Sequence, residues 1–431
     1  MFKLLELKNY RTHKCTAIEP IDLSLIIGSN NSGKSNFLRG LHFFSRLISR
    51  YNPVKEPIHE TDHESQDEYY FSDLRSYEYN SNKHSMCKIG EPISFRCIWS
   101  KDNYNIEYNL SIFPNIKDDR LILSTEKLTL LFPDNNITFE NGFDINSSKL
   151  LLRKKIYESN NHFREKEIVN LFFHDLATFY YYNFQPSFLK GDAFSGSYIR
   201  GKLVPSYKKD FLGNFKTNNV FPYPPSAIGK EGGNLLELLC FIKEQDQETF
   251  SRFIGYLKRF VKNFNNFVLK ENGLKWQFDM GGSNFPYYDP DKISDGLVRA
   301  AAIALLCSIR KPPALIMIEE IENGINQKNL HEFLNWLRDT SDNSKKTQFI
   351  FTSHSPSVIR EFSQRPDSVY NFHLKEKDFI TLVTNLNDAI KPLVNMGTVE
   401  GEEITVNNKK IIAIKPFDLV ELFYNGVLGE I

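Results

Sequence analysis

The segment that most constrains the fold of this chain is the run GSNNSGKS at residues 28–35. It fits the pattern G-x-x-x-x-G-K-[ST], in which backbone N–H groups of a glycine-rich loop and of the following helix surround phosphates. An apolar run of strand length, residues 23–27, precedes it, and apolar residues at helical spacing follow from Phe37 to Phe44. The sequence therefore predicts that residues 1–48 form two strands, a phosphate-binding loop and its helix, with a site for ATP or GTP. The alternative is a glycine-rich turn that only begins a helix.

Two side chains of this loop have predicted roles. Lys34 is placed to reach the β- and γ-phosphates, and the Ser35 hydroxyl is placed to bind Mg²⁺. Both expectations follow from the position of these residues at the start of the predicted helix.

Composition narrows the class of protein. The 431 residues carry 53 basic and 53 acidic side chains, so the net charge is zero and nucleic acid binding would need a local basic patch. Five scattered cysteines without C-x-x-C spacing argue against a disulfide framework or a zinc site. No 18-residue apolar stretch and no signal peptide are evident, so we expect a cytoplasmic protein that does not enter a membrane.

The middle of the chain contains several distinct segments. Residues 59–68, HETDHESQDE, suggest either a metal site with His59 and His63 or, preferably, a solvated loop. Short alternating runs from residue 93 to about residue 140 predict an antiparallel β meander. Residues 149–175 are predicted to be helical and partly basic, and residues 178–184 form a Tyr/Phe-rich strand that ends at Gln185. A Gly/Ser/Pro-rich stretch, residues 190–233, is predicted to be mostly loop.

Two helices are predicted after this stretch. The second has an apolar face, which we interpret as core rather than as a ligand groove, and its basic residues are the best local candidates for contacts to a nucleic acid backbone: Arg252, Lys258, Arg259 and Lys262. No heptad tract and no internal repeat is apparent, so no coiled-coil arm is expected.

A second constellation follows at residues 314–325, ALIMIEEIENGI. The apolar run 314–318 predicts a buried strand, and Glu319 and Glu320 stand at its carboxyl end, where open α/β sheets place ligand chemistry. In phosphoryl transfer one such carboxylate can hold Mg²⁺ and the other can orient or deprotonate the attacking water. The alternative is a strand that runs into an acidic surface loop.

Two further motifs lie near this strand in sequence. The strand at residues 347–351 ends in TSHSP, where we expect an exposed His354 that could hydrogen-bond a γ-phosphate. Before the acidic strand, Ser294 is a candidate N-cap, and Gly296 is expected to let the backbone approach a ligand closely at the start of an Ala-rich, buried helix.

Taken together, GSNNSGKSN, ISDGLVR, ALIMIEEIENGI and TSHSP resemble the ABC-type ATPases of the RecF/SMC and OLD (overcoming lysogenisation) group. The resemblance is strongest to stand-alone ATPases of phage-defence systems, such as the PARIS ATPase, RloA-like proteins and the Septu ATPase. It spans residue 1 to about residue 360, and the opening LKNYRTHKCTAI also resembles that group's first strand and turn. It implies ATP and Mg²⁺ as cofactors and a P-loop α/β fold with an antiparallel β subdomain and a helical insertion.

The resemblance also implies roles for individual residues. It makes residues 28–35 the Walker A loop, so the nucleotide contacts are Gly28, Asn30, Asn31, Ser32, Gly33, Lys34, Ser35 and Asn36. Ser294, Asp295 and Gly296 become the signature motif, which in this group contacts ATP held by the opposite subunit.

The remaining roles concern hydrolysis. Glu319 takes the Walker B place with Mg²⁺, Glu320 is the catalytic carboxylate, Asn323 and Gly324 begin the D-loop, and His354 is the switch histidine. Gln185 is, by position, the Q-loop glutamine and a metal ligand. The chain departs from the usual motifs at three places. It has SDG where transporters have SGG, Glu319 where aspartate is more frequent, and Asn326-Gln327 where a histidine-proline pair often follows the Walker B segment. Hydrolysis is therefore expected to be slow.

The implied organisation has three segments: residues 1–145 with Walker A and the β subdomain, residues 146–290 as the helical insertion, and residues 291–431 with the remaining motifs and a short tail. No Asp-x-Asp pair of a Toprim nuclease follows His354, so we expect no nuclease there. The amphipathic tail PFDLVELFYNGVL predicts either a docking face or packing against the ATPase body.

The sequence is compatible with two functions. The first is a regulatory ATPase of an anti-phage defence system, in which ATP closes a homodimer or higher homo-oligomer that holds or releases a separate effector or toxin protein. The alternative is a RecF-like DNA repair or processing ATPase. Neutral charge and the absence of arms favour the first, so nucleic acid is a possible partner but not a required one. A transporter subunit and a P-loop kinase fit the motifs less well.

Overall fold

The structure of the chain is a computed structural model. It describes residues 1–50, 91–115, 120–132, 136–141, 156, 163–190, 198–199, 202–203, 208–209, 215–216, 228–270, 273–310, 312–344, 347–375, 377–406 and 409–425. The described residues divide into two compact units. The first comprises Met1–Tyr181, Pro313–Met317 and Lys346–Ile431, and the second Tyr182–Pro312 and Ile318–Lys345. The division into three segments stays a prediction.

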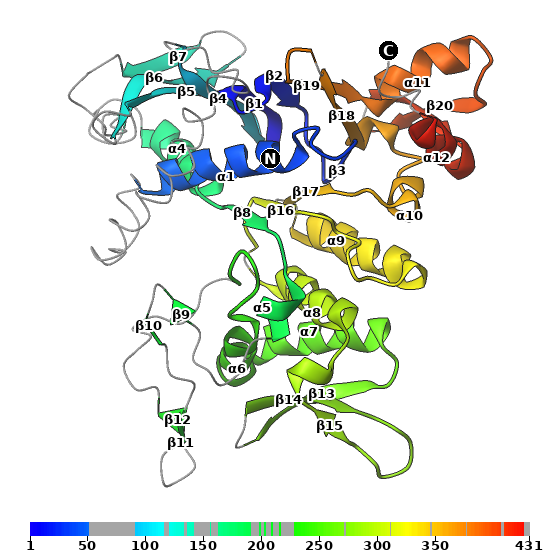
Figure 1. Ribbon diagram of the computed structural model, residues 1–431. Coiled ribbons are helices and arrows are strands. Elements are labelled where there is room, and N and C mark those ends of the chain that lie inside the picture. Colours follow the sequence, from blue (N-terminus) through cyan, green and yellow to red (C-terminus); the bar gives the residue numbers. More distant parts are fainter. Residues whose placement is uncertain are drawn as a thin grey trace. The chain divides into compact units, whose positions relative to one another are not determined.

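The first unit contains an antiparallel sheet with the order β2-β1-β4-β5-β6-β7 (Figure 1). Its strands are β1 (Phe2–Tyr10), β2 (His13–Ile18), β4 (Ile93–Lys101), β5 (Tyr104–Asn115), β6 (Arg120–Leu131) and β7 (Ile137–Asn141). The predicted meander is therefore confirmed. Only two strands were predicted before the phosphate loop and that count was wrong, because left-handed backbone at Asn9 and Arg11 turns the chain into the β1–β2 hairpin.

Two helices cover one face of this sheet, α1 (Lys34–Arg50) and α4 (Phe163–Leu176). Phe44 of α1 stacks on Phe95 with ring centroids 5.3 Å apart, and Phe172 of α4 meets Trp99 at 5.8 Å. Alternation along β4 places every second side chain in this core, as a half-buried strand requires. The apolar face of α1 is thereby fixed, and with it the helix start that bears the phosphate loop.

The first unit also holds a second sheet, with the order β19-β18-β3-β17-β16-β8. Its strands are β3 (Leu23–Ile27), β8 (Phe179–Tyr182), β16 (Leu315–Ile318), β17 (Gln348–Thr352), β18 (Val369–Lys375) and β19 (Ile380–Asn385). The central strand β3 runs parallel to β17 and to β18, and it is buried at every position, as expected where both faces are covered. The predicted α/β fold class with an antiparallel subdomain is confirmed.

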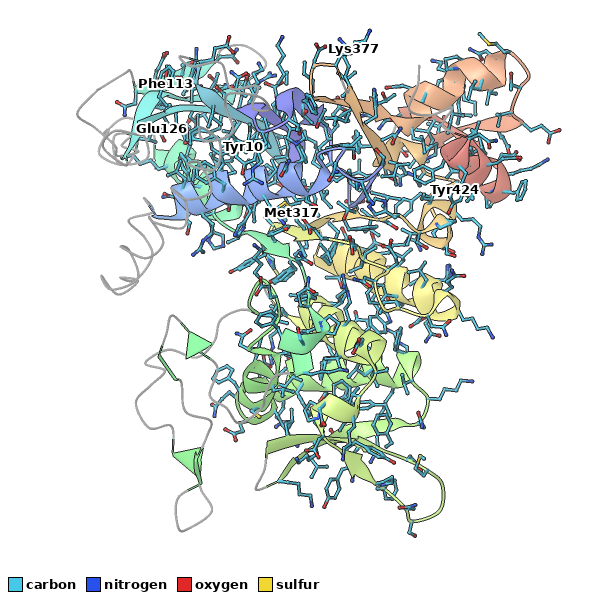
Figure 2. All side chains as sticks on the ribbon, viewed as in Figure 1. Tyr10, Phe113, Glu126, Met317, Lys377 and Tyr424 are labelled. Atoms are coloured by element: carbon cyan, nitrogen blue, oxygen red, sulfur yellow. The ribbon has the colours of Figure 1, made fainter. Side chains whose placement is uncertain are left out.

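The tail after His354 belongs to the first unit. It contains α10 (Pro356–Arg360), α11 (Leu386–Asn395), the hairpin β20 (Gly401–Val406) with β21 (Lys409–Ile414), and α12 (Pro416–Tyr424). Leu419 and Leu422 of α12 are buried whereas Phe417 is 72% exposed, and Figure 2 shows Tyr424 on the same helix. The inner residues of this stripe therefore pack against the body of the unit.

The second unit is mainly helical. Its helices are α5 (Pro186–Lys190), α6 (Leu235–Gln245), α7 (Gln247–Phe260), α8 (Asp295–Ser308) and α9 (Leu330–Ser344), with 3₁₀ turns at Pro290–Lys292 and Gln327–Asn329. A small antiparallel sheet joins β13 (Phe264–Lys270), β14 (Gly273–Phe278) and β15 (Tyr287–Tyr288). Short ladders pair β9 (Tyr198–Ile199) with β10 (Lys202–Leu203) and β11 (Lys208–Lys209) with β12 (Phe215–Lys216).

The core of the second unit confirms the interpretation of the predicted apolar helix. Phe250, Phe253 and Leu257 of α7 are buried, and Phe253 stacks on Phe267 of β13 at 5.6 Å. The predictions at His59, at His63 and at residues 153–155 lie outside the described residues. Within the described part of the chain, no helix has both the length and the apolar character that crossing a membrane requires.

Candidate functional site: a phosphate loop and an acidic segment

The phosphate loop follows β3 directly and has a backbone that demands glycine at two positions. Gly28 has φ +138° and Gly33 has φ +98°. A Cβ on Gly28 would lie 2.0 Å from the Phe372 carbonyl oxygen, and one on Gly33 would lie 2.3 Å from the Thr381 hydroxyl. The loop therefore rests on β18 and β19, where the Thr381 hydroxyl also donates to the Ser32 carbonyl at 2.9 Å.

The ammonium group of Lys34 lies over this loop. It donates to the carbonyls of Gly28 at 2.9 Å and Ser29 at 2.7 Å and approaches the Ser32 hydroxyl at 3.4 Å, and the residue is only 7% exposed. The first turn of α1 has no acidic residue. The N–H groups and the positive dipole end of a helix start favour an anion. These residues fit a bound triphosphate, because phosphate oxygens are the acceptors that this cation and these N–H groups can take.

Other loop residues lie at the surface or against neighbouring strands. Asn30 and Asn31 are exposed, and Asn31 has φ +65°. Ser35 and Asn36 are half-buried in the first turn of α1, and Asn36 accepts a hydrogen bond of 2.8 Å from Arg11. The fold thus gathers the whole predicted loop at one helix start.

His354 follows β17 in the same unit. It is half-buried rather than exposed, which corrects the expectation from sequence. The segment turns at once into α10, where the Ser355 N–H donates to the Ser353 hydroxyl at 2.9 Å.

The acidic segment lies in the second unit, and its two glutamates differ in burial and in backbone conformation. Glu319 is 7% exposed, and its N–H donates to the Tyr182 carbonyl at 2.9 Å. Glu320 is exposed and has φ +45°, a left-handed conformation that non-glycine residues rarely adopt. Asn323 closes the turn, since its N–H donates to the Glu320 carbonyl at 2.9 Å and its amide lies 3.4 Å from the Glu320 carboxylate.

The signature segment begins α8 as predicted. The Ser294 hydroxyl accepts from the Leu297 N–H at 3.4 Å, so the N-cap is confirmed. A Cβ on Gly296 would lie 2.0 Å from the Gly324 carbonyl oxygen, so the close approach that this glycine permits is to the turn after the acidic pair. Ser294 and Asp295 are exposed, and the Asp295 carboxylate pairs with Lys190 at 2.5 Å.

Gln185 is also exposed, at the start of α5, and its amide donates to the Asn183 side chain at 3.0 Å. In the described part of the chain, no three His, Cys, Asp or Glu residues lie together as a metal cluster. Mg²⁺ at phosphate sites takes one or two protein ligands besides phosphate oxygens and water, and the hydroxyl of Ser35 and the carboxylate of Glu319 are donors of the right chemistry.

Comparison with known proteins shows the family to which the chain belongs. A family model described as "AAA domain, putative AbiEii toxin, Type IV TA system" matches residues 99–360, which is more than half of the chain. The chain belongs to this family. The matched residues include the signature segment, both glutamates and His354, and the phosphate loop lies before them. No curated protein matches the sequence.

Several solved structures are similar. One is an Smc head bound to the C-winged helix domain of ScpA, with 14% identity and a TM-score of 0.44 over 90% of this chain and 99% of that one. Another is the SMC head domain from Thermotoga maritima, with 14% identity and a TM-score of 0.40 over 89% and 98%. A third is an Smc head with an extended coiled coil bound to the C-terminal domain of ScpA from Pyrococcus furiosus, with 12% identity and a TM-score of 0.39 over 92% and 99%.

The sequence did not reveal two buried residues that hydrogen-bond the backbone of the phosphate loop and of the acidic segment. His13 is fully buried, and because the Gly33 carbonyl can only accept, its Nε2–H donates there at 3.1 Å while Nδ1 accepts from Thr16 at 2.9 Å. Arg299 of α8 is the second such residue, the one charge within the apolar run at residues 297–306 of that helix. A charged residue within an apolar helix sequence was the signal that could have identified Arg299. No local pattern of residues identifies His13.

Proposed function

We propose that this chain binds ATP with Mg²⁺ and hydrolyses it slowly. The observation that carries the proposal is the buried Lys34 ammonium, held by oxygens of a loop whose two glycines are required by left-handed backbone and by close packing. Few structural roles need a cation, a helix start and such a loop together, whereas a triphosphate needs all three.

The roles of the remaining residues follow from their chemistry. The bound metal would neutralise charge on the phosphates; Ser35 and Gln185 would hold it directly, and Glu319 would hold it through water. Glu320 orients the attacking water and accepts its proton, and His354 hydrogen-bonds the γ-phosphate. Ser294, Asp295 and Gly296 contact the ATP of a second copy of this chain, so two sites form in a homodimer.

We further propose that ATP-dependent dimerisation controls a separate effector in an anti-phage defence system. The family description, which names a toxin of a type IV toxin–antitoxin system, supports a defence context. The alternative, a RecF-like DNA-processing ATPase, is favoured by one observation, the four exposed basic residues Arg252, Lys258, Arg259 and Lys262. One of them, Arg259, already lies 3.4 Å from Glu332.

Mixing two variants tests the shared site. Ser294→Arg places a long side chain where the second copy's phosphates must approach, so it should bind ATP normally, fail to dimerise with ATP and lose turnover. Lys34→Ala should lose ATP binding. A mixture of the two should regain at most one working site per heterodimer, measured as phosphate release. Full turnover by Ser294→Arg alone would contradict the shared site.

The role is tested by co-expression with the neighbouring gene and pull-down with and without ATP. We expect a partner whose retention changes with nucleotide, and hydrolysis that DNA affects weakly. Growth arrest caused by this chain alone would place the toxic activity in the chain itself. Many-fold stimulation of hydrolysis by DNA ends, without any partner, would favour the DNA-processing alternative.

A further inference from the structure

Helix α8 contains one charged side chain within a buried apolar stretch. Arg299 is 1% exposed, and residues 297–306 of this helix are otherwise apolar and buried. Burial lowers the pKa of Arg299, and the carboxylates of Glu320 and Glu322 partly oppose that change. An apolar residue of similar volume usually fills such a position at lower cost than a buried charge. The reason for an arginine must therefore lie in its hydrogen bonds.

The guanidinium of Arg299 binds three backbone carbonyls from two separate segments. Its Nη1 donates to the Phe184 carbonyl at 3.1 Å, and its Nη2 donates to the carbonyls of Glu319 at 2.8 Å and Glu320 at 2.6 Å. A guanidinium is a planar fork with donors at fixed angles, so it sets the relative positions of the groups that it binds. Phe184 directly precedes Gln185, so the same side chain also anchors that segment.

Two of these carbonyls flank one strained residue. The carbonyl of Glu319 belongs to the peptide group before the Cα of Glu320, and the carbonyl of Glu320 belongs to the peptide group after it. Holding both peptide groups fixes φ and ψ of Glu320, and these angles set the direction of its Cα–Cβ bond. The observed φ of +45° costs a non-glycine residue free energy and persists only where the surroundings impose it.

We propose that Arg299 is a positioning residue for ATP hydrolysis, which holds Glu320 in its left-handed conformation and so aims the Glu320 carboxylate at the attacking water. The inference rests on the proposed function, in which Glu320 performs that task. Without the guanidinium, the segment can relax toward a right-handed backbone, and the carboxylate then points elsewhere. Nucleotide binding through Lys34 does not depend on this contact.

The test separates turnover from binding in purified full-length protein. Arg299→Met keeps much of the side-chain volume, and we expect kcat to fall about 100-fold, as displacement of a catalytic group by about 1 Å can cause. The affinity for a fluorescent ATP analogue should stay within about twofold of wild type. Arg299→Lys keeps the charge but has one nitrogen in place of the fork, so it should lose roughly tenfold in kcat. The control is Arg310→Met, which removes an exposed arginine just beyond the same helix.

A merely structural role for Arg299 predicts another pattern. If Arg299 acts through Glu320, then Arg299→Met should lower single-turnover hydrolysis no further in a Glu320→Gln background. An additional loss of the same size there would overturn the inference, as would wild-type kcat in Arg299→Lys. Should Arg299→Met fail to fold, the Arg299→Lys variant decides.

The two failures can be told apart. A wild-type protein without ATP hydrolysis would refute the proposed function and this inference with it. Hydrolysis that Glu320→Gln abolishes but that both Arg299 variants retain would refute only the inference.

Discussion

The phosphate loop and the acidic segment both depend on left-handed backbone, but they obtain it by different means. In the loop, Gly28 and Gly33 have positive φ, which glycine adopts at no steric cost. In the acidic segment the left-handed residue is Glu320, whose flanking carbonyls accept hydrogen bonds from Arg299, about twenty residues away in sequence. The left-handed backbone of the loop is thus made possible by glycines of the loop itself. In the acidic segment it is stabilised by a side chain of helix α8.

The comparison leads to an expectation about function. Changes in the loop should act mainly on nucleotide binding, because its groups meet phosphates in the ground state. Changes in the acidic segment should act mainly on kcat, because its groups matter once the water attacks.

The largest effect is expected for Glu320→Gln, which keeps the shape of the side chain but removes the base. We expect kcat to fall about 1,000-fold, within the range typical of a lost general base, with ATP affinity unchanged. Phosphate release and binding of a fluorescent ATP analogue measure the two quantities. If Glu320→Gln turns over normally while Glu319→Gln or Glu322→Gln does not, the role belongs to that neighbour.

Lys34→Ala should produce the complementary result. Removing a cation that binds phosphate oxygens should weaken ATP binding by about 3 kcal/mol, which is more than 100-fold in Kd. The exposed Lys377→Ala is the matched control, and it should bind normally. Near-normal affinity in Lys34→Ala would mean that the loop is a structural turn.

Gly28→Ala and Gly296→Ala compare the two regions with one kind of change. In both, the new Cβ would lie 2.0 Å from a backbone oxygen, that of Phe372 for Gly28 and that of Gly324 for Gly296. We expect each to lower the free energy of unfolding by about 2 kcal/mol, with Gly28→Ala weakening ATP affinity and Gly296→Ala lowering kcat.

The control for this pair is Gly255→Ala in α7, where an added Cβ meets no described atom within 4 Å. There the protein should become more stable by about 0.5 kcal/mol, because alanine favours a helix. Urea denaturation measures all three variants. Equal effects of Gly28→Ala and Gly296→Ala on both affinity and kcat would remove the distinction between the regions.

A further small effect is a pH dependence from His13 of β2, whose ring is hydrogen-bonded to Gly33 of the loop. Burial, and less strongly the charge of Arg11, lowers the pKa of His13 to about 4, while its bond to Gly33 opposes the change. Because the unfolded chain then binds the proton more tightly than the folded chain, this contribution to stability is complete above pH 6.5. It is lost as the pH falls from 6.5 toward 4.

Between pH 7 and pH 5.5 the loss from His13 should be about 1 kcal/mol. Urea denaturation of wild type and His13→Asn across this range checks it, since the variant should show a shallower dependence on pH. Parallel curves for the two proteins would show that His13 does not titrate as its burial implies.

Much of the fold and of the candidate site could be predicted from local patterns. The strand before Gly28, the buried strand before Glu319, the N-cap at Ser294 and the antiparallel meander each depend on residues close together in sequence. Such features follow from side-chain periodicity, glycine conformations and capping, which act over a few residues. The β1–β2 hairpin was missed as a pair of strands: Asn9 is a residue type that tolerates left-handed backbone, but Arg11, which also has positive φ, is not.

By itself, the sequence determined which residues are candidates for binding phosphate, metal and water, and that each stands at the end of a strand or the start of a helix. Only the tertiary structure decided which distant side chains hydrogen-bond the segments that contain these residues. His13 lies beneath Gly33 because β2 pairs with β1, and Arg299 reaches Phe184 across 115 residues of sequence. The physical reason is that a buried hydrogen bond depends on where the chain returns in space, and no local pattern of residues specifies that.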